Sequence, residues 1–208
     1  TYLIRLATKY LPFQFARNAY QLAMRIMSWL KYREWHFPRI MILEVSGHCN
    51  RSCAYCPNNH VVQPKEFVSD AVVDKFCERL KEIRWSGVVD FIFFNEPLLH
   101  PGLEKIVRQV KDACPGSMPR VSTNGDALTE KRMVSLMEAG ITRFYVMQHL
   151  PHRAGWLERM KFLEAKYPGF MVLMDIEQVE MSTGLHTFGG LFEVKQAHNA
   201  KVCHIHEL

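Results

Sequence analysis

Segments typical of β-strands and segments typical of α-helices alternate through most of this 208-residue chain. The segment Val88–Phe94 is almost entirely apolar, as expected for a parallel strand that is covered on both faces. Repeated strand–helix units predict an α/β fold with a parallel sheet and right-handed crossovers. The predicted strands are Arg39–Val45, Val88–Phe94, Pro119–Ser122, Ile141–Met147 and Phe170–Ile176, and a sixth is expected near Gln178–Met181.

Helix start and stop signals stand between these strands. Ser69 and Thr129 are residue types that cap helix N-termini, and Gly140 is a typical C-terminal stop. Apolar residues at helical spacing follow both caps. The predicted helices run from Ser69 to Ile83, from Leu103 to Val110, from Thr129 to Ala139 and from Trp156 to Tyr167.

A basic helical leader precedes the first strand. The formal net charge of the chain is +5, and residues 1–36 account for all of it, because six basic residues stand there against Glu34. From Phe13 to Trp35, apolar residues recur at helical spacing and form one stripe. Such a helix either packs this stripe on the domain or on a partner chain, or lies on an anionic membrane surface.

Composition narrows the class of protein. The sequence has no apolar run long enough to span a membrane, and no secretory signal with a cleavage site. Its six cysteines, several of them crowded together, do not resemble a disulfide framework, so a reducing cytoplasm is expected. Outside the leader no basic patch indicates binding to nucleic acid.

Three of the six cysteines follow the first predicted strand. Cys49, Cys53 and Cys56 are separated by three residues and then by two. A structural zinc site needs four protein ligands, so His48 or His60 would have to complete it. A four-iron cluster has one metal at each corner, and three thiolates leave one iron open to a small molecule. The spacing favours the cluster.

Polar residues follow the next two predicted strands at their carboxyl ends, where parallel βα folds build their sites. Asn95 and Glu96 follow the second strand, and Glu96 is a natural carboxylate partner for a cationic group. Asn95 belongs to the residue type, other than glycine, that best tolerates unusual backbone angles. Ser122 and Asn124 follow the third strand and could contact the hydroxyls of a ribose, or could form a capped turn.

Gln148 and His149 emerge after the apolar fourth strand and suggest the edge of the same site. Taken together with the run from Cys49 to Cys56 and with Asn95-Glu96-Pro97, these residues resemble the radical S-adenosylmethionine (radical SAM) superfamily. In that superfamily the second motif is Gly-Gly-Glu-Pro, so Asn95 replaces a glycine. The resemblance implies a partial (β/α)6 barrel, that is, a partial TIM barrel, preceded here by the amphipathic helix.

The resemblance also implies cofactors and an activity. A [4Fe–4S] cluster on the three cysteines would bind SAM through its open iron, and SAM would be cleaved to a 5′-deoxyadenosyl radical that removes a hydrogen atom from a small-molecule substrate. An electron donor such as flavodoxin or ferredoxin would reduce the cluster. Tyr55 would cover the adenine, unless it serves only loop packing. The implied SAM contacts are Tyr55, Asn95, Glu96, Ser122, Asn124 and Gln148.

Residues Ile40–His149 closely resemble the 2-deoxy-scyllo-inosamine dehydrogenase branch of the superfamily, which oxidises a secondary alcohol of an aminocyclitol. This branch and the related SPASM proteins carry an auxiliary cluster, and Cys203 falls where its first ligand is expected. An arginine thought to help deprotonate the alcohol is replaced by Phe188. His149 and His186 are the candidate bases that remain.

These observations predict three parts: a leader at residues 1–36, a radical SAM partial barrel at 37–185, and the start of a SPASM/twitch-like extension at 186–208, expected to be truncated after Leu208. The predicted protein is a cytoplasmic radical SAM enzyme that oxidises a small polar substrate, with peripheral membrane contact through its leader. The alternatives are a SPASM-type peptide or protein maturase and a non-catalytic metal-binding accessory protein.

Overall fold

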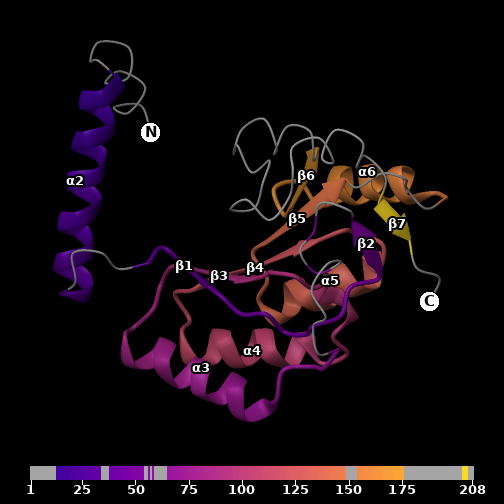
Figure 1. Ribbon diagram of the computed structural model, residues 1–208, viewed down its shortest axis with the longest axis horizontal. Helices are drawn as coiled ribbons and strands as arrows, with labels where there is room; N and C mark the ends of the chain where they lie inside the picture. Colours follow the sequence, from indigo (N-terminus) through magenta and orange to yellow (C-terminus); the bar gives the residue numbers. More distant parts are fainter. Residues whose placement is uncertain are drawn as a thin grey trace. The chain divides into compact units, whose positions relative to one another are not determined.

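The computed structural model describes residues 13–33, 38–53, 56, 58, 65–148, 154–175 and 203–205. The chain divides into two compact units, Thr1–Arg39 and Ile40–Leu208. Helix α2 (Phe13–Tyr32) belongs to the first unit, and the strands and remaining helices belong to the second. The helix and strand regions can be followed by label in Figure 1.

Helix α2 confirms the amphipathic helix predicted between Phe13 and Trp35. It ends at Tyr32, and the next residue, Arg33, has a φ of 60° in the left-handed region that does not continue an α-helix. The Arg33 guanidinium lies over the ring of Trp29, 4.9 Å from its centroid, which holds this end in place. Among the described residues, no helix is both long and apolar enough to cross a membrane.

Five parallel strands form the central sheet in the order β1-β3-β4-β5-β6. The strands of this sheet lie side by side in the order in which they occur along the chain. The connection between each adjacent pair contains an α-helix, as predicted (Figure 1). The sixth predicted strand, Gln178–Met181, lies outside the described residues. The strands are β1 (Ile40–Ile42), β3 (Val88–Phe91), β4 (Met118–Thr123), β5 (Arg143–Gln148) and β6 (Met171–Asp175).

One face of this sheet is apolar and buried. Phe91, Val121 and Phe144 are aligned on it by the strand register, and each is fully buried. The α-helices that follow the strands turn apolar side chains inward, among them Leu103 and Trp156. Burial of each such side chain contributes about 1.5–3 kcal/mol to folding. The helices are α3 (Asp70–Glu82), α4 (Leu103–Ala113), α5 (Glu130–Ala139) and α6 (Trp156–Lys166), and α3, α4 and α5 lie along one side of the sheet in Figure 1.

The three predicted cap residues, Ser69, Thr129 and Gly140, stand at helix ends as expected, whereas the end of α4 differs from the prediction. The Thr129 side chain accepts a hydrogen bond from the backbone N–H of Arg132, and Gly140 ends α5 with a φ of 118°. Ser69 does occupy the N-cap position of α3, but its hydroxyl makes no capping hydrogen bond. Its backbone carbonyl instead accepts from the N–H groups of Val72 and Val73. Helix α4 extends three residues beyond the predicted end, to Ala113.

A second, two-stranded sheet was not expected from the sequence. Strand β2 (Arg51–Cys53) lies inside the cysteine segment, which had been predicted as a loop, and pairs antiparallel with β7 (Cys203–Ile205). In this register Cys53 is the Cα partner of Cys203, and Ser52 is the partner of His204. The pairing brings the predicted extension back to the cysteine segment across about 150 residues of chain.

Candidate functional site

Three segments that follow β1, β3 and β4 meet at the carboxyl ends of the strands. The backbone N–H of Glu96 donates to the carbonyl oxygen of His48 at 2.7 Å, next to Cys49. The N–H of Phe94 donates to the Glu44 carboxylate at 2.9 Å. The segment after β3 is therefore tied directly to the chain that leads into the cysteines. A short 3-10 helix, η2 (Pro97–Leu99), follows it.

The three cysteines lie in this region. Cys53 is buried on β2, whereas Cys49 and Cys56 are half-buried. The N–H of Cys56 donates to the carbonyl oxygen of Cys53 at 2.9 Å, which closes a turn between them. Tyr55 and His60 lie outside the described residues. The segment thus presents three thiols from one compact stretch of chain.

Among the described residues, the candidate donors do not converge on a single metal ion. Within the described ranges, no three cysteine, histidine or acidic side chains are placed so that they could hold one ion. The ring of His48, a candidate zinc ligand, stacks on Phe67 with 5.1 Å between the ring centroids. A cuboidal cluster meets each thiolate through a different iron, so its three ligands need not converge on one point.

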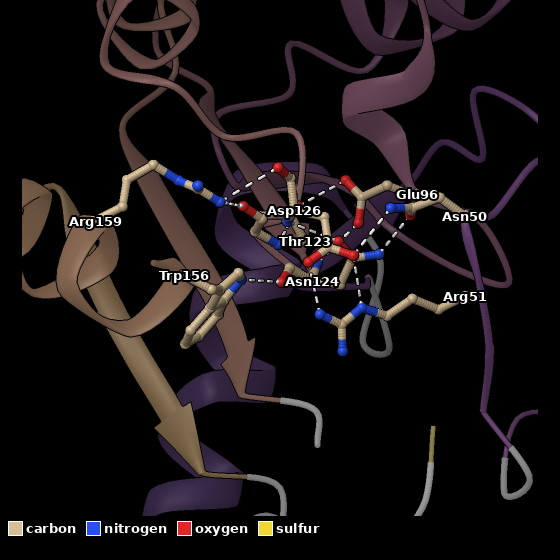
Figure 2. A network of polar contacts seen from close by, with 9 residues as sticks. Asn50, Arg51, Glu96, Thr123, Asn124, Asp126, Trp156 and Arg159 are labelled. Atoms are coloured by element: carbon tan, nitrogen blue, oxygen red, sulfur yellow. Dashed lines mark hydrogen bonds and ion pairs between the residues drawn. The ribbon is translucent and has the colours of Figure 1, made fainter. Parts of the chain in front are cut away.

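The two residues after Cys49 are anchored in a buried polar network (Figure 2). Arg51 donates from Nε and Nη2 to the two carboxylate oxygens of Asp126, at 2.8 and 2.6 Å. Asn50 donates to the same carboxylate at 3.0 Å. Both charged side chains are only 1% exposed, and their forked geometry satisfies the carboxylate that burial would otherwise destabilise.

Asn124 and Glu96 extend the network to the other two strand ends, and Figure 2 shows their side chains turned toward it. The Asn124 amide donates to Asn50 at 2.8 Å and accepts from the N–H of Asp126 at 2.9 Å. Glu96 accepts from Thr123 Oγ1 at 2.6 Å and from the N–H of Leu98 with one oxygen, and from the N–H of Asn124 with the other. These hydrogen bonds join the segment after β3 to the segment at the end of β4.

Glu96 is fully buried among these donors. Burial raises the pKa of its carboxyl group to about 7, although hydrogen bonds from Thr123, Asn124 and Leu98 favour the ionised form, and the nearby Asp126 carboxylate adds to the rise. These three donors all come from protein, and they leave one lone pair of Oε2 for a further donor. The contacts make Glu96 a residue that positions the turn after β4.

That turn needs a glycine at one point. Gly125 has a φ of 75°, and a Cβ atom there would lie 2.8 Å from Val146 Cγ1. The turn is also fixed from α6, since Trp156 Nε1 donates to the carbonyl oxygen of Asn124 at 3.1 Å. Arg159 donates to the carbonyl oxygens of Gly125 and Asp126. The whole turn is bonded on several sides before any ligand binds.

Asn95 differs from the neighbouring polar residues. Both polar atoms of its side-chain amide are buried and have no hydrogen-bond partner in the protein. Its backbone does not adopt a positive φ, so the tolerance of asparagine for unusual backbone angles is not used at this position. A buried amide without partners costs several kcal/mol in an apolar setting, so water or a ligand is expected to satisfy this group.

The remaining predicted residues are placed as follows. Ser122 is buried on β4, and its hydroxyl donates to Asp90 at 3.4 Å rather than pointing away from the protein. Gln148 is half-buried at the end of β5, beside Asp175 in the register. The two candidate bases, His149 and His186, lie outside the described residues.

Sequence reasoning missed Arg51, Asp126, Asp90 and Arg120. Asp90 and Arg120 are paired at 2.6 Å between adjacent strands. A signal was present for this pair, because each is a charged residue inside a predicted strand, where an unpaired charge would be costly. The Arg51–Asp126 pair spans 75 residues, and nothing in the local pattern indicates it.

Comparison with known proteins agrees with this arrangement. The sequence pattern of the radical SAM superfamily matches residues 43–165, which include the three cysteines and all the strand-end motifs described above. The chain belongs to the radical SAM superfamily. Membership implies a four-iron cluster and SAM as cofactors, and it decides between the cluster and zinc in favour of the cluster.

Individual relatives point to one branch of the radical SAM superfamily. The S-adenosyl-L-methionine-dependent 2-deoxy-scyllo-inosamine dehydrogenase of Niallia circulans is 40% identical over 109 residues, which are 51% of this chain and 43% of that protein. The crystal structure of BtrN in complex with AdoMet and 2-DOIA is 30% identical, with a TM-score of 0.65, and covers 69% of this chain and 58% of that one.

A more distant structure shares the fold alone. SuiB of Streptococcus suis, bound to S-adenosylmethionine, has a TM-score of 0.51 at 12% identity and covers 84% of this chain and 43% of that one. The chain spans less than half of the length of the curated dehydrogenase that it matches. The parallel α/β partial barrel predicted from the sequence is confirmed by the BtrN match.

Proposed function

We propose that Cys49, Cys53 and Cys56 hold the four-iron cluster of a radical SAM enzyme that removes a hydrogen atom from a small polar substrate. The main support is the buried Arg51–Asp126 pair, because it fixes the chain between the first two cysteines against the turn after β4. When bound, the cluster supplies the electron for reductive cleavage of SAM, and SAM supplies the hydrogen-atom abstraction.

The protein's own residues bind and orient SAM in this proposal. The buried amide of Asn95 has one donor group and one acceptor atom without partners, and both suit the amino and carboxylate groups of the SAM methionine. Tyr55, Ser122 and Gln148 are proposed as further contacts. Glu96 and Asn124 are also proposed as SAM contacts, and their protein hydrogen bonds hold the turn after β4 in place for that role.

The proposed reaction is oxidation of a secondary alcohol of an aminocyclitol or a related carbohydrate. The support is the 40% identity to a dehydrogenase of this kind over 109 residues. His149 and His186 remain the proposed bases for the alcohol proton. A flavodoxin or ferredoxin is the proposed electron donor. The leader helix α2 is proposed to contact an anionic membrane surface, which co-sedimentation with anionic and neutral liposomes would test.

Anaerobic reconstitution tests the cluster. We expect about four irons and four sulfides per chain. Cys56→Ala should lose cluster content, whereas Cys77→Ala is the matched control. Cys77 lies on α3, and burial raises the pKa of its thiol to about 11, which makes it a poor metal ligand. Zinc without labile sulfide in the wild type would contradict the proposal.

Isotope transfer tests the reaction. With reductant, SAM and 2-deoxy-scyllo-inosamine deuterated at the reacting carbon, we expect deuterium in 5′-deoxyadenosine. An aminocyclitol that binds while no label is transferred would remove the dehydrogenase assignment.

A further inference from the structure

The face of the sheet away from α3 to α6 carries a polar cluster in which only Ser122 is a proposed SAM contact. Asp90 on β3 is the register partner of Arg120 on β4, and Ser122 is the register partner of Tyr145 on β5. Alternate residues of a strand point to opposite faces, so these side chains share one face while Val89, Val121 and Phe144 share the buried one. This face is polar at the centre of the sheet.

The Arg120 guanidinium is held in place from two sides. Its Nε donates to Asp90 Oδ2 at 2.6 Å, and its plane lies over the Tyr145 ring, 5.0 Å from the centroid. Ser122 supports the same carboxylate at 3.4 Å. Because Asp90 and Tyr145 already fix the arginine, a ligand that binds it would not have to order a long flexible side chain.

Among the described residues, none forms a hydrogen bond with the terminal nitrogens of Arg120. Only Nε is used in a hydrogen bond to a described residue, and the side chain is 24% exposed, compared with 5% for Asp90. The neighbouring strand leaves this face open, since Ile42, the register partner of Asp90 on β1, is 51% exposed. Two forked donors, an adjacent carboxylate and an aromatic ring therefore border the same open face.

We propose that Arg120, Asp90 and Tyr145 form a binding site for adjacent hydroxyl groups of a cyclic polyol. Arg120 donates to two neighbouring oxygens, the Asp90 carboxylate accepts from a hydroxyl, and the apolar face of the sugar-like ring lies near Tyr145. Asp90 neutralises Arg120 itself, and the neighbouring cation on this face, Arg143 at the next register position, is exposed to solvent; we therefore expect neutral hydroxyls to be preferred over a free anion. The inference rests on the proposed function, because it names the substrate group that this enzyme recognises.

Direct binding tests the site without turnover. Reconstituted protein with SAM and no reductant is titrated with myo-inositol and 2-deoxy-scyllo-inosamine by calorimetry, and with succinate as an anionic probe. We expect both cyclitols to bind and succinate not to. Arg120→Lys keeps a cation beside Asp90 but loses the fork, and should weaken cyclitol binding about tenfold or more. Arg120→Gln should weaken it at least as much.

The matched control is Arg143→Gln, which removes the same charge from an exposed side chain at the register position beside Arg120. Its cyclitol affinity should stay at the wild-type value. Unchanged affinity in Arg120→Lys, an equal loss in Arg143→Gln, or binding of succinate in preference to the cyclitols would overturn the inference. SAM cleavage by the wild type is scored separately, so a failure of this site is distinguishable from a failure of the proposed function.

Discussion

Two arginine–carboxylate pairs serve different parts of this molecule. Arg51 and Asp126 are each 1% exposed, and their contacts join the cysteine segment to the turn after β4. Arg120 and Asp90 lie in mid-sheet, and Arg120 is 24% exposed. Two of the Arg51 nitrogens bond to the carboxylate, compared with one of the Arg120 nitrogens. The first pair is closed within the protein, whereas the second keeps donors for a ligand.

The difference shows how the same residue types divide between support and recognition. A buried ion pair is tolerated only where further hydrogen bonds satisfy its remaining groups, and Asn50 completes the Arg51–Asp126 pair in this way. A partly exposed pair bears no such requirement, since water or a ligand can satisfy the arginine. Exposure and the number of protein partners, rather than the pair itself, distinguish the two roles.

The largest expected effect breaks the closed pair. Arg51→Ala leaves Asp126 buried without its cation and should lower the free energy of unfolding by about 3–5 kcal/mol. Chemical denaturation measures the loss. The control is Arg79→Ala, which removes an exposed ion pair with Glu82 and should cost under about 1 kcal/mol. A similar decrease in the free energy of unfolding in both variants would show that the buried Arg51–Asp126 pair stabilises the fold no more than an exposed ion pair does.

A smaller effect is expected at the open pair. Arg120→Gln can still donate one hydrogen bond to Asp90, so it should destabilise the fold by only about 1–2 kcal/mol. The same unfolding experiment tests this value against Arg51→Ala. If Arg120→Gln costs as much as Arg51→Ala, the mid-sheet pair is also structural and the contrast fails.

The pH dependence of stability extends the comparison to Glu96, a third buried carboxylate. Its hydrogen-bond donors among the described residues are neutral groups, whereas Asp126 and Asp90 each pair with an arginine. The pKa of Glu96 is raised to about 7 in the folded state, so between about pH 4.5 and 7 the folded protein binds more protons than the unfolded chain. Stability contributed by the neutral form is present at low pH and is lost as the pH rises through this window, by at most about 1.4 kcal/mol per pH unit. Glu96→Gln should flatten the slope. An unchanged slope would mean that Glu96 stays ionised.

The smallest effect concerns the unpartnered amide. Asn95→Ala removes two buried polar atoms that have no protein partner, and should leave the free energy of unfolding without SAM unchanged or raise it by about 1 kcal/mol. Affinity for SAM, measured by equilibrium dialysis, should fall. Equal or tighter SAM binding in this variant would show that the Asn95 side chain does not contribute to SAM binding.

Sequence periodicity predicted the five strands and four helices of the βα region because hydrophobic patterns reflect burial directly. Caps such as Thr129 and Gly140 were also readable, since their hydrogen bonds are local. The role of Asn124 was not readable. Its residue type suits both a ribose contact and a turn, and only its bonds to Asn50 and Asp126 show that both ends of the amide are used.

The pairing of β2 with β7 was likewise outside the reach of pattern reasoning. Arg51–Cys53 is too short and too polar to read as a strand, and its partner lies about 150 residues away. The cysteine positions were predicted for a different reason. Their spacing carries the geometry of the cluster itself, so no contact between distant residues was needed to recognise them.

The central claim is that the three cysteines hold a cluster that cleaves SAM. The most direct measurement is the yield of 5′-deoxyadenosine from reduced, reconstituted protein and SAM, compared between wild type, Cys56→Ala and Cys77→Ala. We predict 5′-deoxyadenosine from the wild type and Cys77→Ala and none from Cys56→Ala. A wild-type protein with about four irons and four sulfides that binds SAM but produces no 5′-deoxyadenosine would contradict the account.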